Sequence, residues 1–458
     1  MLFRSMADKA KQTVDRIFQY EIETGKVEPL VIEKEQSILA LVGDNMKSHP
    51  GIAGKMFNVL GRNGVNIRAI AQGSSERNIS AVIATEDARK AINVLHEAFF
   101  ETTYRQVNLF VAGVGNVGSR LLAQLHQQQG YLQEHLRLQI NVVGIANSKK
   151  MLSREEGIDL SHWREDLAKA EPMNLNQFIE LIRSKNLRNA VFADVTANET
   201  VAGVYAPLME KSISVVACNK IAAASQFSHY RKLKDLAREF NCSFLFETNV
   251  GAGLPIIGTL NDLLRTGDQV NRIEAVLSGT LNFVFNNYNG QRPFAEVVKQ
   301  AQDEGYTEPD PRLDLSGIDV MRKIMILTRE AGYTLEMEEI VNHKFLPESC
   351  MKGSVSDFYA AMAKEEDHFR KLYQVAEQGG KKLKFVASFT HSQGSIKAEV
   401  GLQHIDPAHN LYHLYGKDNI VLFYTNRYVE QPLVVKGAGA GAEVTASGVF
   451  ADIMRTLR

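Results

Sequence analysis

An apolar run at residues 107–112 leads directly into the sequence GVGNVG at residues 113–118, and an apolar-periodic stretch follows it. This order predicts a buried strand, a tight glycine turn and a helix, which together bind the pyrophosphate of a dinucleotide at the helix N-terminus. A GxGxxG pattern alone is weak evidence for a cofactor site, because glycine-rich turns also occur where no ligand binds. Since the flanking strand and helix are both predicted here, we expect cofactor contacts at Gly113, Gly115, Asn116, Val117 and Gly118.

Strands and helices alternate after this turn. The further predicted strands lie at residues 140–145, 190–194 and 215–217. Alternation of this kind predicts an α/β domain with a Rossmann-type, doubly wound parallel sheet that has helices on both faces. We place this domain at residues 105–246. A glycine-rich stretch at 437–441 precedes a predicted final helix and can return the chain to the cofactor, so residues 426–458 are expected to complete the domain.

The end of the second strand distinguishes between the two nicotinamide cofactors. A carboxylate at this position would bond the ribose hydroxyls and repel a 2′-phosphate. The sequence has none, and it offers Lys149 and Lys150 instead. Lysines can receive a phosphate, although they can also be ordinary solvated loop residues. We therefore expect NADP as the cofactor, with Lys149 as a contact and NAD as the alternative.

Residues 35–104 show a different, more compact pattern. The predicted strands lie at 37–42, 65–71 and 79–84, the predicted helices at 52–60 and 87–99, and a short final strand near Tyr104. The order is β-α-β-β-α-β, with a polar turn at 73–78, and its free strand edges suit side-by-side assembly. Residues 1–34 are interpreted as the remnant of a preceding regulatory domain with a linker, which would make the chain a piece of a longer protein.

The balance of charge excludes one class of partner. The 458 residues carry 52 Lys and Arg against 53 Asp and Glu, so no basic field gathers nucleic acid or anionic lipid. No secretory signal and no membrane-spanning apolar run is found, and the three cysteines form no CxxC pair. We therefore expect a cytoplasmic protein whose partners are small molecules and sister chains, with neither nucleic acid nor membrane among them.

Residues 305–323 gather the densest set of acids, prolines and a helix start. Pro309 and Pro311 stiffen the chain around Glu308 and Asp310, which suits recognition of an ammonium group. Reduction of a carbonyl also requires a proton donor beside the cofactor. This segment is therefore the first place to look for groups that bind a substrate.

Two lysines are candidates for the proton-handling group. Lys323 follows Asp319 by one helical turn on the same face, although spacing alone favours a surface ion pair. Lys220 ends a predicted parallel strand, where open α/β sheets bind ligands, and a solvated loop lysine is the alternative. An aldehyde-oxidising dehydrogenase would instead need an activated thiolate, and none of the cysteines lies in such a setting.

Residues 246–255 combine Glu247 with a glycine-rich turn that can direct several carbonyl oxygens at one point. Such oxygens can hold a hard monovalent or divalent cation, although the pattern alone favours a plain turn.

Several of these segments resemble homoserine dehydrogenases, and the order of modules is similar to the C-terminal part of the bifunctional aspartokinase–homoserine dehydrogenases. The resemblance covers nearly everything from Val107 onward. The long proline-containing motif is the most specific part of it, and it favours a catalytic role for Asp319 and Lys323 over a surface pair. The matching segments are GVGNVG at 113–118, NK at 219–220, ETNVGAGLPII at 247–257, SGTLN at 278–282 and GYTEPDPRLDLSGIDVMRK at 305–323.

The resemblance implies an α+β catalytic and dimerisation domain at residues 247–425, and the reversible reduction of L-aspartate 4-semialdehyde to L-homoserine on the aspartate pathway to threonine and methionine. Lys323 would exchange a proton with the substrate oxygen, and Lys220 would lie near the reacting carbonyl and the cofactor. Asp319 and Glu308 would bind the amino-acid end. Asp314 is a weaker candidate for the same role, because Leu313 stands before it where the family often has a second acid.

The resemblance also implies further ligand contacts. Thr196, Gly279 and Gly441 would touch the cofactor. A structural sodium ion would be coordinated by Glu247 and by the main-chain carbonyls of Val250, Ala252 and Leu254. The kinase portion of the bifunctional proteins is absent from the sequence, so only the dehydrogenase activity is implied.

Residues 35–104 resemble an ACT domain, which implies allosteric inhibition by threonine with Gln72 as an effector contact. An equally weighted interpretation is that this module serves assembly alone. The expected assembly is a homodimer or a homotetramer. A non-enzymatic alternative makes the whole chain an amino-acid sensor with a degenerate dehydrogenase fold, but that alternative predicts damaged positions at Lys220, Glu308, Asp319 and Lys323, which are intact.

Overall fold

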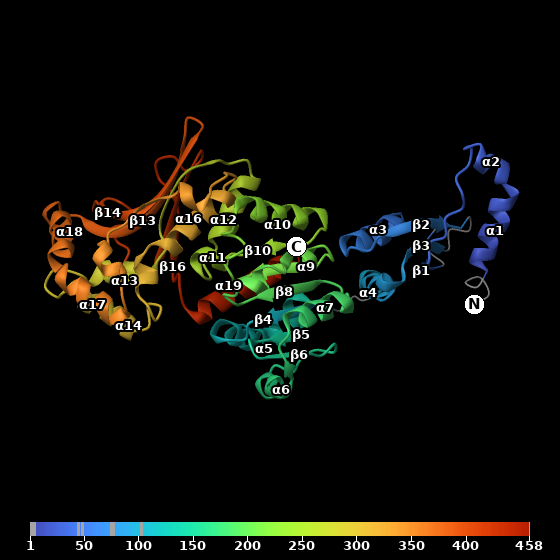
Figure 1. Ribbon diagram of the computed structural model, residues 1–458, viewed down its shortest axis with the longest axis horizontal. Helices are drawn as coiled ribbons and strands as arrows, with labels where there is room; N and C mark the ends of the chain where they lie inside the picture. The colour runs from blue at the N-terminus through green and yellow to red at the C-terminus, as the bar shows by residue number, and fades with distance from the viewer. Residues whose placement is uncertain (1–5, 44–45, 47–49, 74–77, 101–103, 458) are drawn as a thin grey trace. The chain divides into compact units, whose positions relative to one another are not determined.

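The structure is a computed structural model that describes residues 6–43, 46, 50–73, 78–100 and 104–457. The chain forms two compact units, Met1–Thr102 and Thr103–Arg458 (Figure 1). Most of the turn predicted at 73–78 lies outside the described residues.

The first unit is a small antiparallel sheet covered by helices. Its elements are α1 (Ala7–Ile17), α2 (Gln19–Glu23), β1 (Gln36–Val42), α3 (Ile52–Arg62), β2 (Ile67–Gln72), β3 (Asn78–Ala84) and α4 (Ala88–Phe99). The strand order is β1-β3-β2. Every second residue of β3 is buried, because one face of the sheet packs on α3 and α4 while the other does not. Gln72 is the last residue of β2 and is exposed.

The short final strand predicted near Tyr104 is not part of this sheet. Tyr104 lies outside any strand, and the next strand, β4 (Arg105–Ala112), pairs with two strands of the second unit. From Val107 to Ala112 the side chains of β4 are buried on both faces, as expected for a central strand of a parallel sheet.

The predicted doubly wound sheet forms the first part of the second unit. Its strands after β4 are β5 (Leu138–Ala146), β6 (Lys150–Ser153), β7 (Glu171–Pro172), β8 (Ala190–Asp194), β9 (Ser214–Ala217) and β10 (Phe244–Leu245). The order is β10-β9-β8-β4-β5-β6-β7, parallel from β10 to β5 and antiparallel at β6 and β7. Because β5 and β8 lie on opposite sides of β4, the strand order reverses at β4, and such sheets bind ligands in the crevice at this point.

Helices cover both faces of this sheet, and one of them comes from the C-terminus. They are α5 (Asn116–Leu136), α6 (Trp163–Lys169), α7 (Leu175–Lys185), α8 (Glu199–Ala202), α9 (Tyr205–Met209), α10 (Phe227–Glu239) and α19 (Ala442–Arg455). The last of these, red in Figure 1, contacts α5, β8 and β9. Its buried Ala446, Val449 and Ile453 belong to the same apolar core as β4.

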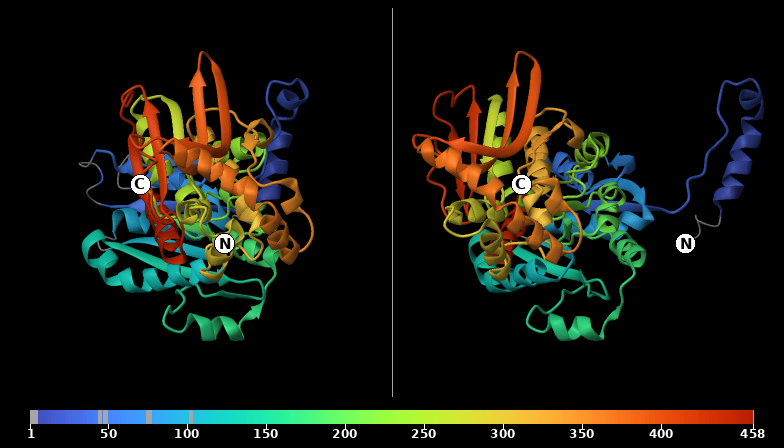
Figure 2. Two further views of the ribbon diagram at one scale, coloured as in Figure 1. Left: turned by 90° about the vertical axis from the view of Figure 1, so that its left-hand side faces the viewer. Right: turned by 60° about the vertical axis from the view of Figure 1, so that its left-hand side comes forward.

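A second, mixed sheet completes the unit. Its strands are β11 (Val270–Val276), β12 (Val341–His343), β13 (Lys382–Ser392), β14 (Ser395–Ile405), β15 (Asn419–Thr425) and β16 (Leu433–Gly437), in the order β12-β14-β13-β11-β15-β16. Its helices are α11 (Thr248–Gly251), α12 (Ile256–Arg265), α13 (Gly279–Asn287), α14 (Phe294–Asp303), α15 (Arg312–Leu315), α16 (Ile318–Glu330), α17 (Val355–Lys364) and α18 (Glu366–Gln378). Figure 2 shows the long β13–β14 hairpin extending past these helices.

None of the helices that the structure describes is both long and apolar enough to cross a lipid bilayer.

Candidate active site

The glycine turn lies at the carboxyl end of β4. Gly113 has a φ of 96°, and a Cβ there would lie 2.6 Å from the Val195 carbonyl oxygen, so only glycine fits. A Cβ on Gly118 would lie 2.0 Å from the Gly113 carbonyl oxygen, which requires a glycine where α5 packs on the turn. A Cβ on Gly115 would meet no atom within 4 Å, so the backbone there is open to an approaching group. Asn116 and Val117 begin α5, whose N-terminus attracts a phosphate.

Asp194, the last residue of β8, is buried and accepts hydrogen bonds from groups around the end of this strand. The Thr196 N–H donates to Asp194 Oδ1 at 2.8 Å, and Asn219 Nδ2 and the Tyr205 hydroxyl donate to Asp194 Oδ2 at 3.0 and 2.6 Å. Burial raises the pKa of Asp194, and these hydrogen bonds oppose the rise. Thr196 also touches the Gly113 turn, so its predicted place beside the cofactor turn is consistent with the geometry.

The two lysines after β5 have different surroundings. The Asn147 side chain accepts hydrogen bonds from the backbone N–H groups of Lys149 and Lys150 at 2.8 and 2.7 Å, which forms a tight turn. Lys150 Nζ donates to the Ala170 carbonyl at 2.7 Å, so this ammonium ties the turn to the end of α6. The Lys149 side chain, in contrast, is exposed.

Lys220, Asp319 and Lys323 form one cluster of charges. Asp319 Oδ1 lies 2.9 Å from Lys220 Nζ, and Asp319 Oδ2 lies 2.9 Å from Lys323 Nζ. Lys323 is only 8% exposed and also donates to the Leu277 carbonyl at 2.7 Å. Burial opposes ionisation of Asp319, but the two ammonium groups hold the pKa of its carboxyl well below the usual range. Burial lowers the pKa of Lys323, the charge of Asp319 partly restores it, and the charge of Lys220 lowers it further.

The proline-containing segment places Asp314 near this cluster. Asp314 Oδ2 accepts from the Glu308 N–H at 2.9 Å, and Oδ1 accepts from the Thr280 hydroxyl at 3.3 Å. Burial raises the pKa of Asp314, and the charges of Glu308 and Asp319 add to the rise. The Glu308 side chain is exposed, so it can meet a ligand that enters from solvent.

Asp310 does not join the site. Its carboxylate binds the Arg312 guanidinium through three hydrogen bonds of 2.6 to 3.1 Å, and Arg312 also donates to the Gly353 carbonyl. The side chain therefore secures the turn before α15, and the prediction that it recognises an ammonium group fails because a cation two residues away already occupies it.

The SGTLN segment and the C-terminal glycines meet at Leu277. The carbonyl oxygen of Leu277 accepts from Lys323 and from Asn419 Nδ2, the latter at 3.3 Å. Gly279 begins α13 two residues later. A Cβ on Gly439 would lie 2.0 Å from Asn419, so the 437–441 stretch packs closely on that side chain, and Gly441 then starts α19. The Leu277 carbonyl thus links Lys323 to Asn419, the side chain on which Gly439 packs.

The Glu247 carboxylate is already occupied by hydrogen-bond donors. Its two oxygens accept from the backbone N–H groups of Ile257 and Gly258 at 2.6 and 2.8 Å, and from Arg455 at 2.9 Å. The Leu254 carbonyl accepts from the Ile256 N–H at 2.8 Å. No group of three or more His, Cys, Asp or Glu side chains that could hold a metal occurs among the described residues. The residues present do not fit a cation held by the Glu247 side chain.

The cysteines lie in settings that suppress thiolate formation. Burial raises the pKa of Cys218 and Cys350, and it raises the pKa of Cys242 to about 12. This agrees with the exclusion of a thiolate-dependent aldehyde oxidation.

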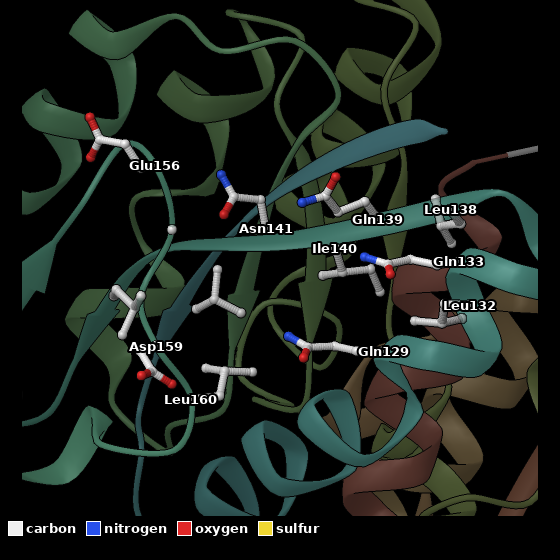
Figure 3. Close-up of a pocket in the computed structure, with 13 residues that line it drawn as sticks. Gln129, Leu132, Gln133, Leu138, Gln139, Ile140, Asn141, Glu156, Asp159 and Leu160 are labelled. Carbon is white, nitrogen blue, oxygen red and sulfur yellow. The ribbon is translucent and has the colours of Figure 1, made fainter. Parts of the chain in front are cut away.

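A surface pocket of about 320 Å³ lies at the amino end of β5, away from the glycine turn at the carboxyl end of β4 (Figure 3). It is lined by the end of α5 and the first residues of β5, with the Glu156 and Asp159 acids on the adjoining loop. It offers no cation for a phosphate and lies at the amino end of β5, so it does not belong to the cofactor site.

Comparison with known proteins agrees with this geometry. Residues 113–247 match the family model for the NAD-binding domain of homoserine dehydrogenase, residues 255–454 match homoserine dehydrogenase, and residues 39–99 match an ACT domain. The chain thus carries an NAD-binding domain, and the two homoserine dehydrogenase models together match more than half of it.

The relatives give the same result. A bifunctional aspartokinase/homoserine dehydrogenase of Haemophilus influenzae is 39% identical over 99% of this chain and 55% of its own length, and one of Zea mays is 41% identical over 96% and 48%. The chain spans about half the length of these curated relatives. A Candida auris protein described as of unknown function is 32% identical, with a TM-score of 0.69 over 77% of this chain and 98% of its own.

A hyperthermophilic archaeal homoserine dehydrogenase, solved in complex with NADPH, is 25% identical with a TM-score of 0.60 over 77% of this chain and 98% of its own. With the glycine turn, the lysine–aspartate cluster and the segment around Leu277 all assembled at one edge of the sheet, these matches show that the chain belongs to the homoserine dehydrogenase family.

Proposed function

We propose that this chain catalyses the reversible, NAD(P)-linked interconversion of L-homoserine and L-aspartate 4-semialdehyde. The observation that carries the proposal is the cluster of Lys220, Asp319 and Lys323, in which one carboxylate lies 2.9 Å from each ammonium. The cluster combines the carboxyl end of β9 with α16, and the Gly113 turn is at the carboxyl end of β4 in the same sheet. Family membership and intact residues at all these positions disfavour the alternative of a non-catalytic sensor.

When bound, the nicotinamide cofactor supplies or accepts the hydride. Lys323 exchanges the proton at the substrate oxygen: its ammonium donates as the aldehyde is reduced, and its neutral amine accepts as the alcohol is oxidised. Burial lowers the pKa of Lys323 towards neutral pH, where a group that both donates and accepts a proton works best. The Lys220 ammonium stabilises negative charge that develops on the same oxygen. Asp319 orients both lysines through its two carboxylate oxygens.

Acidic groups face the other end of the substrate. Glu308 is exposed beside Asp314, and Asp314 is half-buried and fixed by Thr280 and the Glu308 N–H. An amino acid carries an ammonium that these carboxylates attract. We assign Glu308 to this end of the substrate, with Asp314 fixed beside it. Both oxygens of Asp319 are already paired with lysines, so its expected contact with the substrate ammonium stays a prediction.

For the cofactor we propose a preference for NADP. Lys149 is exposed at the end of β5, and the end of this strand carries no acid that would repel a 2′-phosphate. Gly113 to Gly118 hold the pyrophosphate, Thr196 and Gly279 line the crevice, and Gly441 closes it from the C-terminal side. No step is assigned to a sodium ion, because the Glu247 carboxylate already accepts from two backbone N–H groups and from the Arg455 guanidinium. Coordination by the carbonyls of Val250, Ala252 and Leu254 stays a prediction.

Regulation through the ACT domain is a second part of the proposal. An ACT domain beside a biosynthetic enzyme suits inhibition by an end-product amino acid, for which threonine is our candidate and Gln72, at the end of β2, the candidate contact. The alternative is a role in assembling a homodimer or homotetramer.

One assay tests the activity and its regulation. Homoserine-dependent reduction of NADP, and separately of NAD, is followed by absorbance with and without threonine. We expect turnover with a lower KM for NADP than for NAD. A folded protein that reduces neither cofactor would contradict the proposed activity and favour the sensor. Turnover that threonine does not change would leave the ACT domain with the assembly role.

A further inference from the structure

Arg329 lies at the far end of the helix that carries the catalytic candidates. Helix α16 begins at Ile318, carries Asp319 and Lys323 in its first turns, and reaches Arg329 one residue before it ends. At 1.5 Å per residue, Asp319 and Arg329 are about 15 Å apart along the helix axis. The Arg329 side chain is fully buried. A buried guanidinium has five N–H groups to satisfy, so its partners must be built into the fold.

Arg329 binds the loop that follows β9. Its Nη1 donates to the carbonyl oxygens of Ala223 at 3.1 Å and Ser225 at 2.6 Å. Lys220 begins this loop, and its carbonyl accepts from the Ala224 N–H at 2.9 Å. The turn after Lys220 is therefore closed by its own hydrogen bond and fixed from outside by the guanidinium.

Glu336 fixes the guanidinium in turn. Arg329 Nη2 donates to Glu336 Oε2 at 2.7 Å, and the other carboxylate oxygen accepts from the Phe227 N–H at 2.8 Å, where α10 begins. Arg329 Nε donates to the Leu335 carbonyl at 3.0 Å. The guanidinium also lies over the rings of Phe227 and Tyr230, 5.7 and 5.5 Å from their centroids. These contacts leave the Arg329 side chain a single well-defined position.

Helix α16 thus holds the Lys220 loop at two points. Near its start, Asp319 contacts the Lys220 ammonium, and near its end, Arg329 contacts the loop backbone. A lysine side chain is a flexible stem, so the ion pair with Asp319 does not by itself fix the loop, whereas a planar fork bonded to two carbonyls does. We propose that Arg329 is a positioning residue for the reaction proposed above, which fixes the Lys220 loop on the helix that carries Lys323 and so keeps the Lys220 ammonium beside Asp319.

The test is Arg329→Lys, which keeps the charge but removes the fork, with Arg238→Lys on the exposed face of α10 as the matched control. The first readout is the rate at which limiting acetic anhydride labels Lys220, measured by mass spectrometry relative to the exposed Lys299. We expect Lys220 to be labelled faster in Arg329→Lys than in the wild type and the control. We also expect kcat for homoserine to fall about 10- to 100-fold, while KM for NADP stays unchanged.

A merely structural role would lower stability without changing the relative labelling of Lys220 or kcat per folded molecule, and that result would overturn the proposal. Glu336→Gln is the second variant, in case Arg329→Lys does not fold, because it keeps the size of the partner and removes only its charge. We expect the same changes, smaller in size. The inference rests on the proposed function for its kinetic readout alone. If wild-type protein does not turn over homoserine, the proposed function fails, while the labelling of Lys220 still decides whether Arg329 positions it.

Discussion

Lys323 follows Asp319 by one turn of α16, and its ammonium nitrogen lies 2.9 Å from the Asp319 carboxylate. The other oxygen of the same carboxylate lies 2.9 Å from Lys220, which belongs to a different strand and loop. One negative charge therefore stabilises two positive ones, of which Lys323 is buried, and the protonation of Lys323 depends on both neighbours.

Replacing Lys323 with methionine removes the proposed proton-exchanging group while filling nearly the same volume. We expect kcat for homoserine oxidation to fall on the order of 10²- to 10⁴-fold, the usual contribution of general acid–base catalysis. Binding of NADP, measured by fluorescence, should stay unchanged. Lys299→Met, an exposed lysine on α14, is the control and should keep wild-type kcat. Near-normal turnover of folded Lys323→Met would remove Lys323 from the mechanism.

The pH dependence of homoserine oxidation should shift in opposite directions in two variants. Lys323 must be neutral to accept the proton, so kcat/KM rises as pH passes through its pKa. The Asp319 charge raises the pKa of Lys323 and the Lys220 charge lowers it. Asp319→Asn should therefore move the midpoint of the residual activity to lower pH, and Lys220→Met should move it to higher pH. Equal shifts in one direction, measured as kcat/KM profiles, would show that another group titrates.

Lys149 and Lys150 should differ in their effect on cofactor preference. Lys149 is exposed, whereas Lys150 is bonded to the Ala170 carbonyl. A lost charge-assisted hydrogen bond to phosphate is worth about 1.5–3 kcal/mol, so Lys149→Met should raise KM for NADP about tenfold or more and leave KM for NAD unchanged. Lys150→Met is the adjacent control, with little expected effect on the ratio of the two constants. A KM for NADP that responds only to Lys150→Met would reverse the assignment.

The nucleotide-binding sheet could be predicted from the sequence because its signals are local. A run of apolar residues ending in GVGNVG specifies strand, turn and helix without reference to distant parts of the chain. The antiparallel strands β6 and β7 were not predicted, since strands of four and two residues carry little pattern. The final strand of the first unit was predicted wrongly near Tyr104, because the strand that begins at Arg105 is central to the next sheet.

The chemistry of the site is harder to predict from the sequence, because it depends on contacts between residues that are far apart in the chain. Helical periodicity places Asp319 and Lys323 on one face, but a surface pair has the same spacing. What makes Lys323 buried is the Leu277 carbonyl and the loop of Lys220, neither of which is near it in the sequence. Conversely, Asp310 resembled a ligand-binding acid, and its partner Arg312 stands two residues away. The roles of Arg329 and Glu336 leave no trace in any motif.

A last prediction concerns Lys384, a fully buried lysine on β13. Its ammonium donates to the side-chain oxygens of Asn282 and Asn286 at 2.9 and 2.6 Å and to the Leu414 carbonyl at 2.5 Å. Burial lowers the pKa of Lys384 to about 7, and the charges of Lys382 and Lys436 add to the effect. In the unfolded chain the group titrates near 10.5, so between these values the unfolded state binds more protons and the free energy of unfolding rises with pH.

This lysine should therefore give the wild type a pH dependence of stability that Lys384→Met lacks. The contribution is at most ~1.4 kcal/mol per pH unit between roughly pH 7 and pH 10. Urea-unfolding midpoints at a series of pH values should rise more steeply with pH for the wild type and for Lys299→Met than for Lys384→Met. At neutral pH and below, Lys384→Met also loses the three hydrogen bonds that hold α13 to the segment around Leu414. Parallel curves for all three proteins would mean that Lys384 keeps its ordinary pKa in the folded state, with enough solvent around it to carry its charge.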